Sequence, residues 1–198
     1  ERASTSHPHW STGIHGVDLN FGCPSPSVVN HGAGPALLRR PKRLQELFEV
    51  LAEWRAKTSL PVGVIGAKLR LGINKQDERQ GIIRKAVLRA VGRLDYLTVH
   101  ARHAEDQSQN PARWERIREV KELAGDRLLV LGNGDVFTRR DAREMMLSTG
   151  CDAVLVARGA IRTGGLIFDR AWRDDMRVVA GRGMALEQQY RSLVQRFG

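Results

Sequence analysis

The sequence predicts an α/β protein built around a parallel β-sheet. Five short apolar segments alternate with longer segments in which apolar residues recur every three or four positions. The short segments are nearly continuous apolar runs, which is typical of parallel strands covered on both faces. Repeated strand–helix–strand units form right-handed crossovers within one layered domain. The length of 198 residues and the hydrophobic content of 41% suit a single domain with a substantial core.

The first predicted strand ends in a loop that presents a cysteine. In residues 17–21 apolar and polar positions alternate, and the run is too short for a helix. A glycine and a proline flank Cys23, so the backbone turns there instead of continuing the strand. A second glycine cluster at residues 31–35 precedes helix-like sequence, which places the thiol between a strand end and a helix start. The simplest alternative is a small buried cysteine in a turn.

The other elements follow from apolar periodicity and from capping residues. Residues 1–15 show no apolar period and are expected to be irregular. Pro41 can divide the first helix, because proline interrupts a helix interior. Thr138 is a candidate N-cap for the last helix of the sheet region, and Gly150 closes that helix. The later predicted strands are residues 61–69, 95–100, 127–131 and 152–156, and the predicted helices are residues 36–56, 76–92, 114–123 and 139–148, with a basic helical tail from residue 166.

Each predicted strand ends in side chains that can take part in chemistry. The carboxyl ends of parallel strands lie on one face of a sheet or barrel, where barrel enzymes build their active sites. Lys68 follows buried strand positions, and an ammonium there can stabilise negative charge on a bound ring. The alternatives are a lysine that reaches outward to solvent and, for His100, a hydrogen-bonded core histidine. The residues at the five strand ends are Asn20 and Cys23, Lys68 and Arg70, His100 and Arg102, Asn133 and Asp135, and Arg158.

The last two strand ends resemble phosphate-binding loops. Residues 132–134 and 157–160 offer small side chains, exposed backbone N–H groups and a following helix start. In barrels, the loops after the last two strands commonly hold a phosphate. Ordinary turn chemistry is the alternative for the glycines.

Composition excludes several classes of protein. No apolar run approaches the length of a membrane span, and two cysteines are too few for a disulfide framework or a zinc site, so we expect a cytoplasmic protein without a metal. The strand ends lack a carboxylate pair for hydrolysis, and no signature of a cysteine protease is present. The net charge of +10 and pI near 10.5 favour a polyanionic partner, of which nucleic acid is the commonest.

These segments, taken in order, resemble the tRNA-dihydrouridine synthases. The resemblance rests on residues 18–25 (DLNFGCPS), 68–72 (KLRLG), 99–102 (VHAR), 133–135 (NGD) and 150–160 (GCDAVLVARGA), and it runs from about Gly16 to Ile161. The ordered set is far more specific than any one motif. The cysteine loop looks most like that of the bacterial subfamily acting on position 16 of the tRNA D-loop.

The resemblance implies an FMN-dependent oxidoreductase on a TIM barrel. NADPH reduces the flavin, a uridine is flipped out of the tRNA, hydride goes to C6 of uracil, and an acid protonates C5 to give 5,6-dihydrouridine. Cys23 matches the general acid, a role that suits a thiol on a glycine-hinged loop. By the same resemblance the substrate-binding residues are Asn20, Arg70 and Arg102, and the cofactor-binding residues are Lys68, His100, Asn133, Gly134, Asp135, Arg158 and Gly159.

The resemblance also predicts an incomplete barrel. The family's first three strands should precede Gly16, so the five strands here are expected to be barrel strands four to eight, with truncation at both ends. The expected organisation is an irregular segment 1–15, a partial FMN-binding barrel 16–165 and the start of a helical tRNA-binding region 166–198. After Arg102 the sequence departs from the usual threonine-led loop. Two alternatives remain open: a non-catalytic RNA-binding fragment, and an FMN barrel that reduces a small-molecule pyrimidine.

Overall fold

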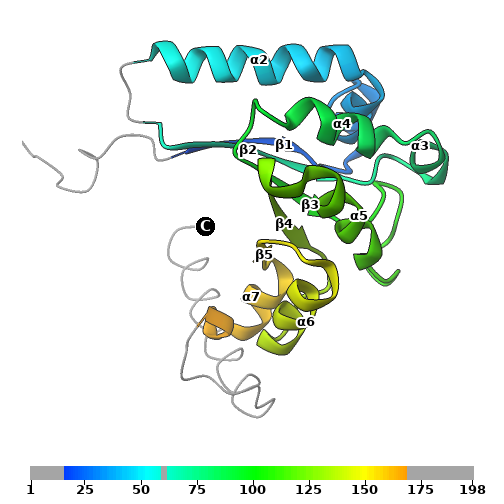
Figure 1. The fold of residues 1–198 in the computed structure, drawn as a ribbon. Coiled ribbons are helices and arrows are strands. Elements are labelled where there is room, and N and C mark those ends of the chain that lie inside the picture. The colour runs from blue at the N-terminus through cyan, green and yellow to red at the C-terminus, as the bar shows by residue number, and fades with distance from the viewer. Residues whose placement is uncertain (1–15, 59–61, 169–198) are drawn as a thin grey trace, which may run out of the picture.

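The computed structural model describes residues 16–58 and 62–168, and these form one parallel sheet covered by helices (Figure 1). The five strands follow one another in the sheet in chain order, and every neighbouring pair is parallel. The predicted α/β class with a parallel sheet is therefore confirmed. The strands are β1 (Gly16–Phe21), β2 (Val64–Arg70), β3 (Tyr96–His100), β4 (Leu129–Asn133) and β5 (Ala153–Leu155).

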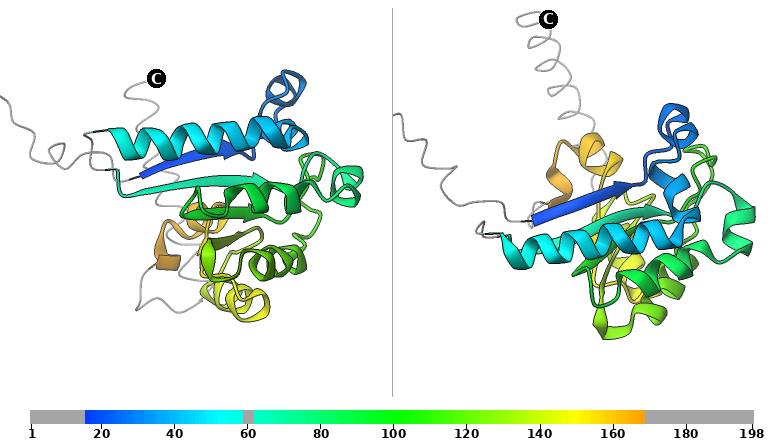
Figure 2. Two further views of the ribbon diagram at one scale, coloured as in Figure 1. Left: turned by 45° about the horizontal axis from the view of Figure 1, so that its top comes forward. Right: turned by 90° about the horizontal axis from the view of Figure 1, so that it is seen from above.

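The main helices pack in succession along one side of the sheet. Figures 1 and 2 show this layer, in which α2 contacts α4, α4 contacts α5 and α5 contacts α6. Each crossover helix thus lies against the helices before and after it. The helices are α1 (Pro26–Asn30), α2 (Pro41–Lys57), α3 (Lys75–Arg79), α4 (Ile82–Ala90), α5 (Trp114–Ala124), α6 (Arg139–Thr149) and α7 (Arg158–Thr163), with short 3-10 turns η1 (Gly34–Arg39), η2 (Gly125–Arg127) and η3 (Leu166–Phe168).

Local sequence signals account for most of the helix boundaries. Pro41 begins α2 and separates it from η1, as predicted. Thr138 and Asp141 form a capping box at the start of α6, and Gly150 ends that helix with a φ of 72°. The single helix predicted over 76–92 is wrong: α3 and α4 are separate helices, because Gly81 between them adopts a left-handed φ of 62°.

The core lies between the sheet and this helical layer. Strand side chains that point toward the helices are almost fully buried, as for Ile65, Leu69 and Val99 at 0% exposure. Phe21 packs edge-on against Phe48 of α2, with ring centroids 6.2 Å apart. Burying one such side chain contributes about 1.5–3 kcal/mol, so this layer supplies the main stabilisation.

The other face of the sheet is more open than the sequence pattern predicts. Val64 is 45% exposed and Leu129 is 53% exposed, and side chains on this face alternate with the buried ones. The prediction that both faces are covered is therefore wrong for the described residues. The strand sequences look apolar throughout because the open face carries small and apolar residues near the strand starts. Its polar residues are concentrated toward the strand ends.

The described sheet is not closed into a barrel, and β1 and β5 form its two edges. The predicted irregular segment 1–15 and all but the first three residues of the predicted segment 166–198 lie outside the described residues. In the part of the chain that is described, no helix combines the length and apolar character needed to cross a bilayer. The same residues contain no cluster of three or more histidine, cysteine or acidic side chains placed to hold a metal ion.

Candidate functional site

The strand register brings the predicted residues of the open face into two rows. Asn20 of β1 pairs in register with Lys68 of β2. One step further along the sheet, Arg70 pairs with His100, and His100 pairs with Asn133 of β4. Because alternate residues point to the same face, these five side chains share the open face near the carboxyl ends of the strands.

The cysteine loop is fixed to these rows by two hydrogen bonds. The backbone N–H of Gly22 donates to Oδ1 of Asn20 at 3.0 Å, which turns the chain at the end of β1. The Nε–H of Arg70 donates to the carbonyl of Gly22 at 2.9 Å. Cys23 follows directly and is a half-buried free thiol. The thiol is therefore held beside the rows, at the edge where the strands end.

Lys68 is the least satisfied of the polar side chains in the rows. It is half-buried, and it makes no hydrogen bond or ion pair with any of the described residues. Burial lowers the pKa of its ammonium, and the neighbouring Arg70 lowers it further. The nearby carboxylate of Asp18 raises this pKa in part but forms no ion pair with the ammonium. A desolvated cation without an ion pair is costly, so this geometry favours an electron-rich ligand on the open face.

His100 is held in its neutral form. Burial lowers the pKa of its imidazole to about 3, and the positive charges of Arg70, Lys68 and Arg102 act in the same direction. A neutral imidazole offers one donor and one acceptor, which suits hydrogen bonding to a polar heterocycle. The site thus combines cations with a neutral histidine across adjacent strands.

The depressed pKa of His100 predicts a loss of stability in mild acid. The unfolded chain binds a proton at this histidine below its ordinary pKa of 6.5, whereas the folded chain does so only near pH 3. The free energy of unfolding should therefore fall as pH drops below 6.5, by about 1–2 kcal/mol between pH 7 and pH 5. Urea unfolding at the two pH values measures this change. His100→Gln should reduce the pH dependence, and an equally steep dependence in that variant would contradict this assignment.

The side chain of Arg102, predicted to bind the substrate, is buried and paired within the protein. Its side chain is 3% exposed and forms a forked ion pair with Asp135, with Nη2 lying 2.6 and 2.7 Å from the two carboxylate oxygens. It also donates to the carbonyls of Asn110 at 2.7 Å and Ser108 at 3.1 Å. Burial alone would raise the pKa of the Asp135 carboxyl. The hydrogen bonds from Arg102 and from the Ala112 N–H outweigh burial and hold this pKa below its usual value. The pair joins the ends of β3 and β4.

The predicted phosphate loops meet around a small hollow of about 40 Å³. Nδ2 of the buried Asn133 donates to the carbonyl of Leu155 at 2.7 Å, which links β4 to β5. The side chain of Arg158 lines this hollow and is 41% exposed, and its Nη2 lies 3.1 Å from Asp135 Oδ1. Gly159 packs so closely that an added Cβ would overlap the carbonyl oxygen of Val136. The structure therefore brings this set together.

Two aromatic residues of the site were not predicted to belong to it. The indole Nε1–H of Trp114 donates to the carbonyl of Gly134 at 2.9 Å, and Phe137 lies under the guanidinium of Arg158 at 5.4 Å. Trp114 has the spacing of an apolar helix face, which hides its polar contact. No sequence signal distinguishes Phe137 from an ordinary apolar loop residue.

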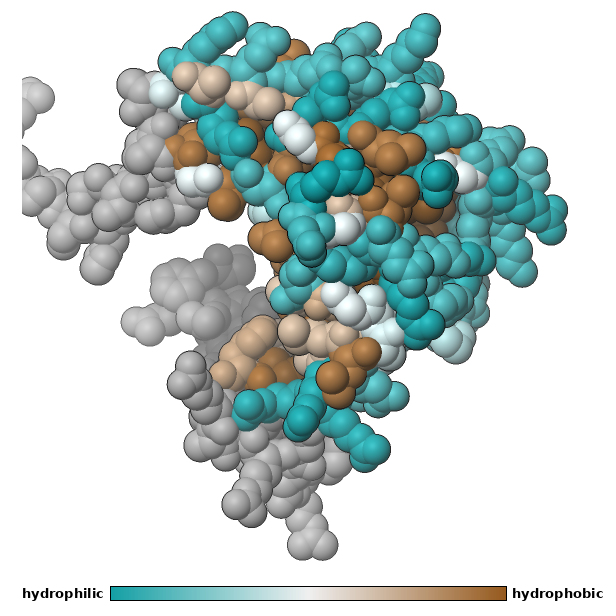
Figure 3. Space-filling model, viewed as in Figure 1, coloured by the Kyte–Doolittle hydropathy of each residue, from teal (hydrophilic) through white to brown (hydrophobic). Residues whose placement is uncertain are grey.

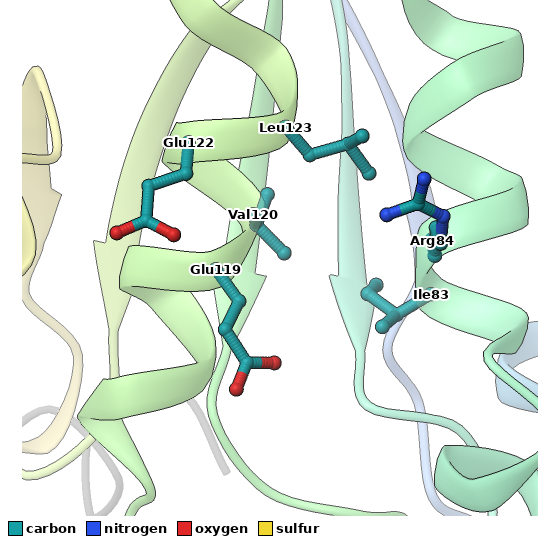
Figure 4. A pocket seen from close by; sticks show the side chains of 6 residues that line it. All are labelled: Ile83, Arg84, Glu119, Val120, Glu122 and Leu123. Atoms are coloured by element: carbon teal, nitrogen blue, oxygen red, sulfur yellow. The ribbon is translucent and has the colours of Figure 1, made fainter.

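A larger hollow lies elsewhere in the described structure. It measures about 480 Å³ and lies on the helical layer between α4 and α5, on the side of the sheet away from Lys68 and His100 (Figure 4). Its lining residues are Ile83, Arg84, Glu119, Val120, Glu122 and Leu123. These residues are apolar side chains between separated charges, and they do not combine a nucleophile with a base or form an anion-binding site. The strand ends therefore remain the candidate active site.

Comparison with known proteins identifies the family. The dihydrouridine synthase family model matches residues 8–197. Among curated relatives, the tRNA-dihydrouridine(16) synthase of Neisseria meningitidis serogroup A is 35% identical over 149 residues, covering 75% of this chain and 42% of the relative. The tRNA-dihydrouridine(16) synthase of Shewanella oneidensis is 34% identical over 149 residues, covering 75% and 44%. A probable tRNA-dihydrouridine synthase of Aquifex aeolicus is 34% identical over 145 residues, covering 73% and 43%.

The chain spans less than half the length of these relatives. The match nevertheless includes all five strands and the loops that follow them, because the family model extends across nearly the whole sequence. The resemblance seen in the individual motifs is thus confirmed along the chain. The chain belongs to the dihydrouridine synthase family.

Proposed function

We propose that this chain carries part of the active site of an FMN- and NADPH-dependent tRNA-dihydrouridine synthase, an oxidoreductase that reduces a uridine of the D-loop to 5,6-dihydrouridine. One observation carries the proposal. The half-buried, unpaired ammonium of Lys68 lies beside Arg70 and the neutral His100, next to a loop that holds Cys23. This arrangement suits an electron-rich ring and a reacting base on the same face.

The residues present fit a flavin mononucleotide. Lys68 and His100 would contact the ring system, since one supplies an unpaired cation and the other a neutral donor. The phosphate would be held by Asn133, Gly134, Arg158 and Gly159, with Asp135 positioning Arg158 through their contact of 3.1 Å. When bound and reduced by NADPH, FMN supplies the hydride for C6 of uracil.

The chain's own residues would orient and protonate the uracil. Cys23 would donate a proton to C5 of uracil. The hydrogen bond from Arg70 to the Gly22 carbonyl would hold the cysteine loop in place for this transfer. Arg70 would also face the base, and burial lowers its pKa, as does the nearby Arg102. Asn20 would hold the uracil through its side-chain N–H₂, because its Oδ1 already accepts from Gly22. A thiol held by backbone hydrogen bonds is preorganised for proton transfer.

The substrate would be a tRNA in the cytoplasm. The net charge of +10 favours a polyanion, and relatives named for position 16 support that uridine as the target. The family fold is a TIM barrel, so residues 16–165 would form its last five strands, and residues 166–198 would begin a helical tRNA-binding region. A small-molecule pyrimidine reductase is less well supported, since it would have no use for the basic surface.

Flavin titration of the purified 198-residue chain tests the proposal. Addition of the chain should quench the fluorescence of FMN in a saturable manner, and Lys68→Met should weaken binding by about tenfold, the loss of one charge-assisted contact. Lys85→Met, which removes an exposed lysine on α4, should bind as the unchanged chain does. If the chain binds tRNA but no flavin, the non-catalytic RNA-binding alternative holds instead.

A further inference from the structure

A second cationic hollow lies close to the candidate active site. It has a volume of about 410 Å³ and is lined by Lys75, Glu78, Arg79, Arg113 and Arg116, so four of its five side chains are cations. Figure 3 shows a strongly hydrophilic surface over α3, which contributes three of these residues. None of them is among the residues assigned to the flavin or the uracil.

The hollow is built by the loops that follow β2 and β3. The backbone N–H groups of Ala104 and Glu105 donate to the carbonyls of Gly72 and Ile73 at 2.9 and 3.0 Å, which joins the two loops. The side chain of Asn74 caps α3 by accepting from two backbone N–H groups. The positions of the cations on α3 are therefore fixed by the backbone.

The acidic groups in this region are already paired. The carboxylate of Glu78 lies 2.5 Å from Nε of Arg116 and 2.9 Å from Nε2 of His103. Arg113 lies 2.7 Å from Asp106 and 2.9 Å from Nδ1 of His103, whose side chain is 2% exposed. These contacts form an internal brace in which Asp106, Glu78 and Glu119 balance the charges of Arg113 and Arg116 and form no ion pair with Lys75 or Arg79.

The two outer cations remain unpaired. Lys75 and Arg79 are exposed, and within the described ranges neither has an acidic partner or a side-chain hydrogen bond. They lie beside the two braced arginines at the same hollow. Two unpaired cations four residues apart on α3 form a surface suited to an anion with several oxygen acceptors.

Arg70 and His103 connect the hollow to the candidate active site. Nη1 of Arg70 donates to the carbonyl of His103 at 2.8 Å, while its Nε donates to the carbonyl of Gly22 beside Cys23. His103 in turn contacts Glu78 and Arg113 of the hollow. An anion bound here would therefore lie on the same edge of the sheet as the reacting base.

We propose that this hollow binds a phosphodiester of the tRNA backbone close to the uridine that is reduced. The inference rests on the proposed function, because it takes tRNA as the substrate. Lys75 and Arg79 contact phosphate oxygens, while Arg113 and Arg116 keep the carboxylates of Asp106 and Glu78 paired. Backbone contacts of this kind carry no sequence information; they set the position and orientation of the nucleic acid. The hollow thereby holds the RNA backbone while Cys23 and Asn20 contact the uracil base.

The salt dependence of tRNA binding tests this site. An unmodified tRNA transcript is titrated with the full 198-residue chain at several salt concentrations, and Lys75→Gln/Arg79→Gln is compared with Lys42→Gln/Lys85→Gln. Both double variants remove two exposed charges, so their net charges are equal. The first should weaken binding about tenfold and reduce the salt slope by about 1.5, as expected for two lost phosphate contacts. The second should have a much smaller effect.

Two results overturn the proposal. One is an equal salt slope in the two double variants, and the other is the absence of tRNA binding by the unchanged chain at low salt. Flavin titration of the same samples separates this inference from the proposed function. If the chain binds flavin and the two double variants have equal salt slopes, only the phosphodiester site is rejected. If Lys75→Gln/Arg79→Gln reduces the salt slope but the chain binds no flavin, the phosphodiester site is supported and the catalytic proposal is rejected.

Discussion

Cys23→Ala should lower the rate of uridine reduction by about 10²–10⁴-fold, the usual contribution of a positioned general acid. The physical reason is that alanine offers no proton for C5, while the backbone that holds the loop is unchanged. Gly22 still bonds to Asn20 and Arg70 in the variant, because both contacts involve main-chain atoms of Gly22. Single-turnover reduction of uridine in an unmodified tRNA, with FMN-loaded protein and NADPH, measures the effect.

The second cysteine provides a matched control for this experiment. Cys151 is buried at 4% exposure against β4, away from the open face, and Cys151→Ala should retain catalysis. Flavin affinity should be the same in both variants and in the unchanged chain, because neither thiol is assigned to the cofactor. Full activity of Cys23→Ala would reject the acid role. A parallel loss of flavin binding would instead show that the loop shapes the cofactor site.

The positions of the site residues could be predicted because strand direction alone determines them. Asn20, Lys68, His100 and Asn133 lie on four different strands, yet each comes at the carboxyl end of an apolar run. In a parallel sheet those ends share one edge, so linear order was sufficient. The two in-register rows could be known only from the observed sheet, since a shift of one residue in a strand would turn its side chains to the helical face.

The environment of charged residues could not be predicted in the same way. Arg102 and Asp135 are 33 residues apart, and Arg116 reaches Glu78 from another helix. Nothing local in the sequence distinguishes a buried ion pair from two solvated charges. The break at Gly81 was missed for a related reason, because the apolar pattern continues through a glycine whose φ becomes visible only in the fold.

Arg102→Met should lower the free energy of unfolding by about 3–5 kcal/mol, as expected when one partner of a buried ion pair is removed. Methionine fills similar space but cannot donate to Asp135 or to the carbonyls of Ser108 and Asn110. The Asp135 carboxylate would keep only the Ala112 N–H at 2.7 Å and the half-exposed Arg158. Urea unfolding followed by tryptophan fluorescence measures the change.

Two further variants separate the buried pair from a contact with substrate. Arg43→Met removes one member of an exposed pair with Glu46 and should change the unfolding free energy by less than about 0.5 kcal/mol. Arg102→Met/Asp135→Asn should recover part of the loss, because the uncompensated carboxylate is gone. If Arg102→Met unfolds like the unchanged chain but binds tRNA more weakly, its role is recognition of the substrate. Loss of stability instead indicates that Arg102 positions the ends of β3 and β4, and with them His100 and the phosphate loop.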